Sequence, residues 1–366
     1  MRALPRKVRE RLIEAGRRLV CQEDARVLVQ PRANEPGFWF GGGNICRDAD
    51  GALLLCGRYR NGGDSRAGIE AGPRGAELAV FRSTDEGRTF AHIASLHKAD
   101  VAPPGEVVLS IEGSCLVRSG RGLELYVSSE KLRDYPAAVR EFQKPGTGVW
   151  SIDVLRAEDA GDLRSAEPEP VLRPAEPARL HVKDPVVFSA AGRTWMVYCA
   201  HPFNWTSSNN YIAERHPDGR FRDRGRMLLP RGPVWDVAVC RVTARLVLPR
   251  AGVLAELPPV SLYFYDGAEC MHDHGRNGRP RGCSCEELGG LAVGVGEAPR
   301  RLTRLSVEAP LFVSPHGTGC SRYASVFEGA EAWIATWQQS QPDGSQPLVT
   351  NRVPKAEVAR ILADRS

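Results

Sequence analysis

The sequence lacks several features that would place the protein in a special class. It has no apolar run long enough to span a membrane. Charged residues recur through positions 1–24, where a secretory signal peptide would need an apolar core. Its 49 basic residues barely exceed its 44 acidic residues, and no basic block is present. We therefore expect a cytoplasmic protein that binds neither a membrane nor nucleic acid.

Glycine-rich nucleotide-binding patterns are also missing. No Walker or dinucleotide motif leads from a strand into a helix, so no nucleotide cofactor is implied. Ten cysteines are present, and most lie within apolar strand patterns. Because no export signal is found, we interpret these as buried free thiols in a reducing compartment. The clearest cases are Cys46, Cys56, Cys115, Cys199 and Cys240.

What the sequence does contain is a repeat. Five segments each form a short apolar strand that carries a polar residue near its start and soon reaches a tight turn. A four-stranded unit repeated in this way is typical of a β-propeller, in which the first strand of each blade lines the central axis. The polar residues of the five segments should therefore converge on one ring at the axis. They are Asn44, Glu112, Asp184, Asp236 and Arg322.

The repeat predicts an all-β fold, a five-bladed β-propeller with short helices at both ends. We expect the N-terminal helix within residues 1–24, the propeller over 25–353 and the C-terminal helix within 354–366. The fifth blade is one strand short. Residues 26–30 can supply the missing strand and close the ring, which removes open sheet edges. The expected blades are 36–97, 108–173, 180–229, 234–308 and 319–353.

Loop lengths predict which face of the propeller is functional. The turns between first and second strands are tight, whereas the loops between second and third strands are long. Antiparallel pairing brings the long loops to the face where the first strands begin, which is also the face of the polar ring. Long loops on a rigid scaffold usually carry function. The long loops are 60–75, 129–147, 201–209, 266–289 and 339–345.

The segment Ser83-Thr84-Asp85-Glu86-Gly87-Arg88-Thr89-Phe90 resembles the Asp-box of sialidases and other propeller glycosidases. In such a turn the Ser and Asp side chains bind backbone amides and the glycine adopts a positive φ. The turn is expected on the face opposite the polar ring, so its role is structural.

The segment Lys183-Asp184-Pro185 resembles a strand of the five-bladed glycoside hydrolases of families 43, 32 and 130. The resemblance implies that Asp184 holds substrate hydroxyls and tunes the catalytic acid. It also implies an Asp base on blade one and a Glu acid on blade four. Here blade one offers Asn44, and blade four offers Asp236 together with Glu269, whose Glu-Cys pair is similar to that of invertases.

Carboxyl groups crowded on a propeller axis can cleave a glycosidic bond. The reaction needs one proton donor and one base or nucleophile, and crowding separates the pKa values of neighbouring carboxyls. The alternative is a structural plug in which the acids form ion pairs with Arg58, Lys183 and Arg322. The candidate catalytic residues are Glu112, Asp184, Asp236 and, in reserve, Glu269.

Aromatic and arginine side chains on the same face suit a sugar ligand. Tryptophans can stack on sugar rings, although local loop packing explains them equally well. Arginines suggest a carboxylate- or sulfate-bearing ligand. The candidate substrate-binding residues are Asn44, Arg58, Arg66, His201, Trp205, Trp235, Arg322, Trp337 and Gln338.

The long loop 266–289 is rich in metal-binding residue types. A structural zinc site is one hypothesis, and ordinary loop residues are the other. The chemistry proposed for the axis requires no cofactor. The candidate zinc ligands are Cys270, His272, His274, Cys283 and Cys285.

Together these patterns predict a glycoside hydrolase with a carbohydrate substrate. A sialidase-like hydrolase of an acidic sugar and a sugar-binding propeller without catalysis are the alternatives, and Asn44 in the position of the expected base favours the latter. Sugar, linkage, stereochemistry and the choice between hydrolysis and phosphorolysis stay open, and the sequence does not indicate the oligomeric state.

Overall fold

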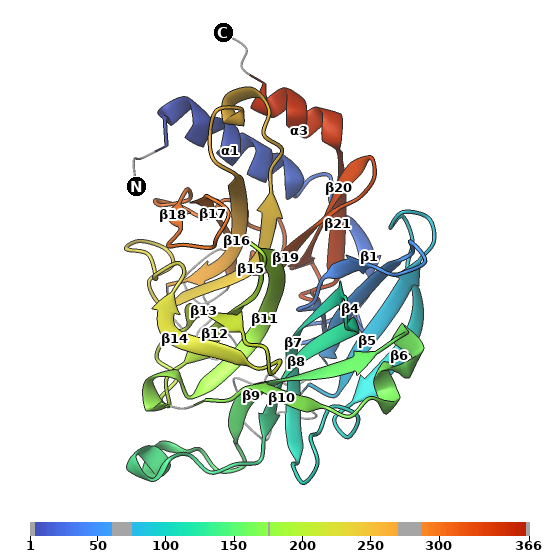
Figure 1. The fold of residues 1–366 in the computed structure, drawn as a ribbon, viewed down its shortest axis with the longest axis vertical. Helices are drawn as coiled ribbons and strands as arrows, with labels where there is room; N and C mark the ends of the chain where they lie inside the picture. The colour runs from blue at the N-terminus through green and yellow to red at the C-terminus, as the bar shows by residue number, and fades with distance from the viewer. Residues whose placement is uncertain (1–3, 61–74, 175, 270–286, 364–366) are drawn as a thin grey trace.

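The computed structural model describes residues 4–60, 75–174, 176–269 and 287–363. Its strands form five antiparallel sheets that follow one another along the chain, and the first strands of neighbouring sheets contact each other (Figure 1). The fold is therefore a five-bladed β-propeller, and the expected fold class is confirmed. None of the described helices is long and apolar enough to cross a membrane.

Blades one and two occupy the first half of the chain. Blade one contains β2 (Trp39–Gly41), β3 (Ile45–Arg47), β4 (Leu53–Arg60), β5 (Glu77–Ser83) and β6 (Ala91–His97). Both β2 and β3 pair with β4, so together they act as one interrupted first strand. Blade two contains β7 (Val108–Ser119), β8 (Gly122–Lys131), β9 (Val149–Ala157) and β10 (Glu169–Leu172).

Blades three, four and five follow. Blade three contains β11 (His181–Ala190), β12 (Arg193–His201), β13 (Asn209–Arg215) and β14 (Phe221–Met227). Blade four contains β15 (Val239–Val247), β16 (Val260–Ala268), β17 (Leu288–Val295) and β18 (Thr303–Arg304). Blade five contains β19 (Ser321–Glu328), β20 (Ala332–Gln339) and β21 (Leu348–Pro354).

The fifth blade takes its fourth strand from the N-terminal part of the chain. Strand β1 (Arg26–Val29) pairs antiparallel with β21, with Val27 opposite Val349. The predicted closure of the ring by residues 26–30 is thus confirmed. Blade five therefore has four strands, and the outer edge of β21 is paired with β1.

The first strand of blade four begins later than the sequence pattern predicts. The expected strand began at Trp235, but β15 begins at Val239 and pairs with β16 from that point. The residues before it form a loop in which the amide of Gly232 binds the carbonyl of Asp236. This shift moves the axial position of blade four away from Asp236.

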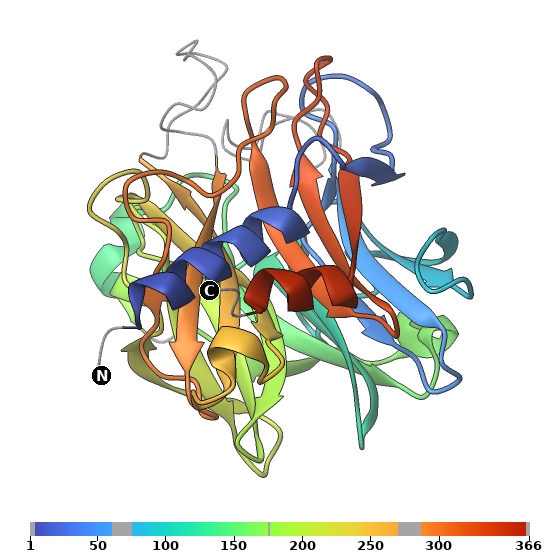
Figure 2. The same ribbon diagram turned by 90° about the horizontal axis from the view of Figure 1, so that it is seen from above.

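Apolar side chains fill each interface between neighbouring blades, and two helices cover the interface between blades four and five (Figure 2). Helices α1 (Arg6–Leu19) and α3 (Lys355–Leu362) bury Leu12, Leu19 and Leu362 there. A Cβ at Gly16 would lie 2.6 Å from a methyl group of Leu291, so only glycine lets α1 approach β17 this closely. Short 3₁₀ helices lie at Ala137–Phe142, Ala160–Ser165, Pro177–Arg179 and Gly252–Leu254.

The turn between β5 and β6 is held by its own side chains. The Asp85 carboxylate accepts hydrogen bonds from the Thr89 amide at 3.0 Å and the Thr89 hydroxyl at 2.6 Å, and the Ser83 hydroxyl accepts one from the Gly87 amide at 2.9 Å. Burial opposes ionisation, but these bonds together outweigh it and hold the pKa of Asp85 well below its usual range. The turn stabilises blade one at the end where β4 begins.

Candidate functional site

Bulges in the inner strands direct polar side chains toward the axis. The pairing of β11 with β12 is interrupted between Lys183 and Val186, and that of β19 with β20 between Arg322 and Ser325. Asp184 adopts φ 54° and Tyr323 also adopts φ 54° at the equivalent point. Positive φ is strained for such residues and is found mainly at functional sites. Pro185 has no N–H to lose where the β11 ladder breaks.

Each blade contributes to the axial site, and neighbouring side chains are joined by ion pairs. Arg58 of blade one binds Glu112 of blade two at 3.1 Å, and Lys183 of blade three approaches the same Glu112 carboxylate to 3.7 Å. The Asp184 carboxylate accepts hydrogen bonds from the Gly113 amide at 3.1 Å and, more weakly, from the Tyr323 hydroxyl at 3.5 Å. A Cβ at Gly113 would lie only 2.3 Å from that carboxylate, so the contact requires glycine.

Arg241 of blade four is the centre of the site. Its guanidinium binds Asp184 at 3.2 Å, Asp266 at 2.7 Å and Glu287 at 3.0 Å, and it lies over the ring of Tyr323 at 4.0 Å from the ring centre. One buried cation therefore holds three carboxyl groups that come from three different segments of the chain. The Tyr323 amide also donates to Asp266, at 3.1 Å.

Glu112 remains ionised at any ordinary pH. Burial alone would raise the pKa of Glu112, but the surrounding cations, first Arg58 and then Lys183, lower it to about 2. A carboxylate held in this state is a poor base, but it can stabilise positive charge that develops on a bound substrate.

We expect this ionised state to stabilise the fold. The pKa of Glu112 is lower in the folded than in the unfolded protein, so its contribution is present above about pH 4.5 and is lost as pH falls toward 2. Glu112→Gln should lower the free energy of unfolding by about 3 kcal/mol at pH 6. Urea denaturation at pH 6 and pH 3 checks this, because the difference from wild type should shrink at the lower pH. An equal difference at both pH values would contradict the assignment.

Asp266 and Glu287 behave differently, because they compete for the same cation. Both contact the same guanidinium nitrogen of Arg241, at 2.7 and 3.0 Å. Burial raises the pKa of Asp266 to about 7, Arg241 opposes the rise, and the negative charge of Glu287 adds to it. The pair therefore holds a proton near neutral pH. Glu287 is also held by Arg322 at 2.5 Å and is the more exposed member, at 18% against 0%.

Two further residues predicted from the sequence, Arg322 and Asn44, hold neighbouring side chains and strands of the axial site in place. Arg322 donates to Gln338 at 3.2 Å and lies over the ring of Trp39. Asn44 binds the backbone of Leu116 in both directions, at 2.7 and 2.9 Å, which joins blade one to blade two. Its amide is thus occupied by the neighbouring strand.

Trp205 and His201 form an aromatic wall beside Lys183. The Trp205 ring stacks on His181 at 4.2 Å and tilts against His201 at 4.6 Å, and the Lys183 ammonium lies 5.4 Å from its centre. Burial, with Lys183 and His181 nearby, holds the pKa of His201 well below its usual range, so this imidazole is neutral.

Two of the predicted sugar platforms are buried instead. Trp337 is fully buried beneath α1, where its indole N–H donates to Gln22 at 3.3 Å. Trp235 is 5% exposed, stacks on Tyr265 and donates to the carbonyl of Ser306. Both rings pack against other protein side chains, Trp235 in blade four and Trp337 in blade five, and neither is accessible to a sugar.

Asp236 does not lie at the axis. Its carboxylate forms an ion pair with Arg304 of the outer strand β18 at 2.7 Å, and burial raises its pKa despite Arg304. The shift of β15 toward the C-terminus explains the difference, because Arg241 occupies the axial position of blade four. Glu269, the reserve acid, is exposed directly after β16. Arg66 and the candidate zinc ligands Cys270, His272, His274, Cys283 and Cys285 lie outside the described residues.

The sequence reading missed the residues that organise the site, namely Arg241, Asp266, Glu287 and Tyr323. Only Asp266 and Glu287 gave a local signal, since they stand at the two ends of the long loop of blade four, where functional residues concentrate. Below the ring, a cavity of about 20 Å³ lined by Asp184 and Tyr323 leads toward a second of about 110 Å³. Neither cavity has room for a whole sugar ring, and Glu287 is the most exposed acid of the ring.

The five-bladed propeller fold of this chain is shared with glycoside hydrolases of known structure. The chain matches no family profile and no curated protein sequence. Solved structures are similar in fold. A β-1,2-mannobiose phosphorylase from Listeria innocua shares 13% identity and a TM-score of 0.57, over 92% of this chain and 96% of that chain.

Two hydrolases are similar to the same degree. An α-L-arabinofuranosidase from Lactobacillus brevis shares 13% identity and a TM-score of 0.57, over 88% of this chain and 92% of that chain. A structure described as a glycoside hydrolase shares 10% identity and a TM-score of 0.63, over 96% of each chain. At these identities the likeness establishes the shared fold.

Proposed function

We propose that the protein cleaves a glycosidic bond at the axial site, as a glycoside hydrolase. The observation that carries this proposal is the pair of carboxyl groups of Asp266 and Glu287 on one nitrogen of Arg241. A pKa near 7 suits a general acid, and carboxyl groups with such shifted pKa values cluster at catalytic sites.

The roles follow from exposure and charge. Glu287, the most exposed acid of the ring, is the group that donates the proton to the leaving oxygen. Its charge and that of Asp266 are crowded on one nitrogen of Arg241, so the two carboxyl groups retain a proton between them near neutral pH. Asp184 lines the axial cavity and is the candidate base or substrate ligand. Glu112, which stays ionised, stabilises positive charge on the sugar ring.

A second candidate function is favoured by the balance of charge. Among the described residues, the axial site holds five cations (Arg58, Arg60, which acts on the charge of Glu112, Lys183, Arg241 and Arg322) against four acids, of which one pair retains a proton near neutral pH. This surplus suits an anion, either a carboxylate on the sugar, as in a sialidase-like reaction, or phosphate in place of water. The similarity to a mannobiose phosphorylase supports the latter.

The experiment is a screen of nitrophenyl glycosides and oligosaccharides, including nitrophenyl glycosides of acidic sugars, with and without inorganic phosphate. Hydrolysis gives a free reducing sugar in both conditions, whereas phosphorolysis gives a sugar phosphate only when phosphate is present. We expect Asp184→Asn to lower turnover at least ~100-fold.

The control variant is Asp236→Asn, whose carboxylate faces Arg304 and not the axis, and it should retain turnover. Wild-type turnover in Asp184→Asn would contradict the proposed site. Saturable sugar binding without turnover in the wild-type protein would instead support the sugar-binding alternative.

A further inference from the structure

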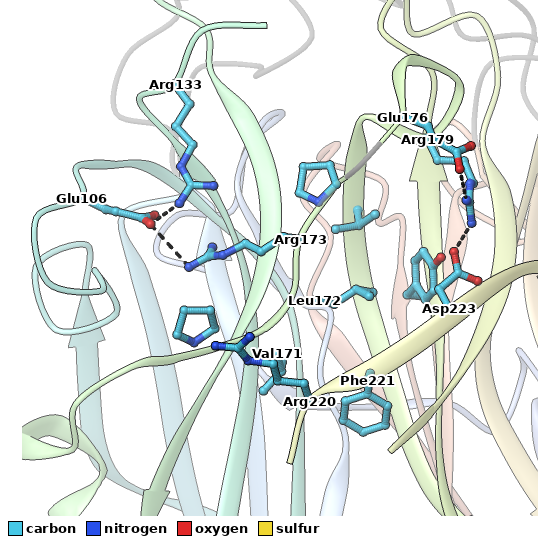
Figure 3. Close-up of a pocket in the computed structure, with 14 residues that line it drawn as sticks. Glu106, Arg133, Val171, Leu172, Arg173, Glu176, Arg179, Arg220, Phe221 and Asp223 are labelled. Carbon is cyan, nitrogen blue, oxygen red and sulfur yellow. Dashed lines mark hydrogen bonds and ion pairs between the residues drawn. The ribbon is translucent and has the colours of Figure 1, made fainter. Parts of the chain in front are cut away.

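A groove distinct from the axial site opens between blades two and three. Its volume is about 620 Å³, which lies within the usual range of small-molecule sites. Figure 3 shows its lining, with one ion-paired group on each wall and, between them, apolar side chains together with Arg220. We infer that this groove binds a neutral sugar unit of an oligosaccharide, independently of the axial site.

The groove exists because the outer strand of blade two is short. Strand β10 has only four residues and a bulge between Pro170 and Leu172, whereas β14 of blade three has seven residues. The edge of blade two therefore leaves blade three uncovered at this point.

The charges of the two walls nearly cancel: four arginines line the groove against three acids, and the fourth arginine, Arg220, is exposed. On the blade-two wall, Glu106 accepts from Arg133 and from Arg173, the latter at 3.4 Å. On the opposite wall, Arg179 binds Asp223 and also binds Glu176 at 3.0 Å (Figure 3).

This balance favours an uncharged ligand with many hydroxyl groups. Because Arg133, Arg173 and Arg179 each pair with a carboxylate, an anion would have to displace an existing pair to reach any arginine of the walls but Arg220. A paired guanidinium still has spare N–H donors, and a paired carboxylate still has free lone pairs. Both groups are planar and can bind two adjacent hydroxyls at once.

The floor of the groove is apolar. It is formed by Val171, Leu172, Val182 and Phe221, each less than 9% exposed. A sugar ring has hydroxyls around its rim and C–H groups on its faces, so it matches polar walls above an apolar floor. A lipid would leave the charged walls without hydrogen-bonding partners, and an inorganic anion would leave the floor uncovered.

The groove and the axial site share strand β11. Val182 faces the groove while the next residue, Lys183, contacts Glu112 at the axis, because alternate residues of a strand point to opposite sides. An oligosaccharide bound in the groove would thus lie on one side of β11, and Lys183 with the axial site on the other side. Sugar binding in the groove depends on the residues that line the groove and does not require catalysis at the axis.

The test is a methyl NMR titration of the full chain with labelled Val and Leu residues. The probes are methyl glycosides of glucose, mannose, galactose, xylose and arabinose, with methyl glucuronide as the acidic comparison. We expect saturable shifts of the Val171, Leu172 and Val182 methyls with at least one neutral glycoside.

The groove variant carries Glu176→Ala and Asp223→Ala, and it should bind that glycoside at least about tenfold more weakly. The matched control is Glu169→Ala on the same strand β10, where Glu169 pairs with Arg156 and does not line the groove. It should bind as wild type does, as should Glu287→Gln.

Three results would overturn the inference. They are the absence of any saturable shift at the groove methyls, shifts confined to Val186 and Val242 at the axial cavity, and binding of methyl glucuronide alone. Shifts confined to the axial cavity would leave the proposed axial function intact. Loss of axial turnover alone would leave the groove inference intact.

Discussion

Glu287→Gln should lower turnover at least ~100-fold, the usual scale for the loss of a general acid. Glutamine keeps the shape of the side chain and can still accept from Arg241 and Arg322, which hold Glu287 at 3.0 and 2.5 Å. It cannot carry the proton. Steady-state kinetics on the substrate found by the screen measure the effect, which should fall on kcat.

The matched control is Glu297→Gln. Glu287 precedes β17 and Glu297 follows it, so the two glutamates stand at opposite ends of one strand, and Glu297 is exposed. This variant should keep wild-type turnover. Equal losses in both variants would show that the effect arises from blade four in general and not from the axial proton.

The same assignment fixes the shape of the pH profile. Because the pKa of Asp266 is raised to about 7, the pair loses its proton as pH rises through that value, and kcat/KM should fall above about pH 7. Asp266→Asn removes the charge that competes with Glu287, so this limb should move to lower pH. A wild-type profile that stays flat from pH 5 to pH 9 would contradict the acid pair.

Arg241→Met should lower the free energy of unfolding at pH 7 by about 3–5 kcal/mol, the scale for a buried charge cluster that loses its counter-ion. Arg241 binds three carboxyl groups, and Met would leave Asp184, Asp266 and Glu287 without that cation. The pKa of Asp266 should rise, because Arg241 lowers it in the wild-type protein.

The sign of the pH dependence follows from that rise. Carboxyl groups with a folded-state pKa above the unfolded value contribute stability at low pH and lose it as pH rises. The variant should therefore be closer to wild type at pH 5 than at pH 8 in urea denaturation. Arg245→Met is the control on the same strand, since Arg245 contacts only the Ser189 carbonyl and the Phe188 ring among described residues outside blade four. It should cost about 1 kcal/mol or less.

The sequence patterns that predicted the fold are local. Alternating apolar residues and tight turns mark most strands to within two residues, and residues 26–29 stand out because blade five lacks a strand without them. Lys183-Asp184-Pro185 predicted an axial residue because proline at a bulge leaves a signature in sequence. Blade four lacked such a signature. Val237, Val239 and Val242 are all apolar, so a period of two could not distinguish a strand that begins at Trp235 from one that begins at Val239.

The charge network of the site could not be read in the same way. Asp266, Glu287 and Tyr323 meet Arg241 only because four segments of the chain come together at the axis. Asp236 fits the sequence pattern of an axial acid near the start of a first strand. Its ion-pair partner Arg304, however, lies on the outer strand of the same blade. Which carboxyl shares which cation is decided by contacts between residues distant in sequence.

The closure of the ring also orders events during synthesis. Arg26 pairs with Thr350, so strand β1 finds its place only after β21 has been made. Until then β1 has no sheet to join. Such distant pairing slows folding and prolongs the exposure of unpaired backbone. Blades one to four are each built from consecutive strands and can form as they emerge, whereas blade five must wait for β1 and β21 to meet.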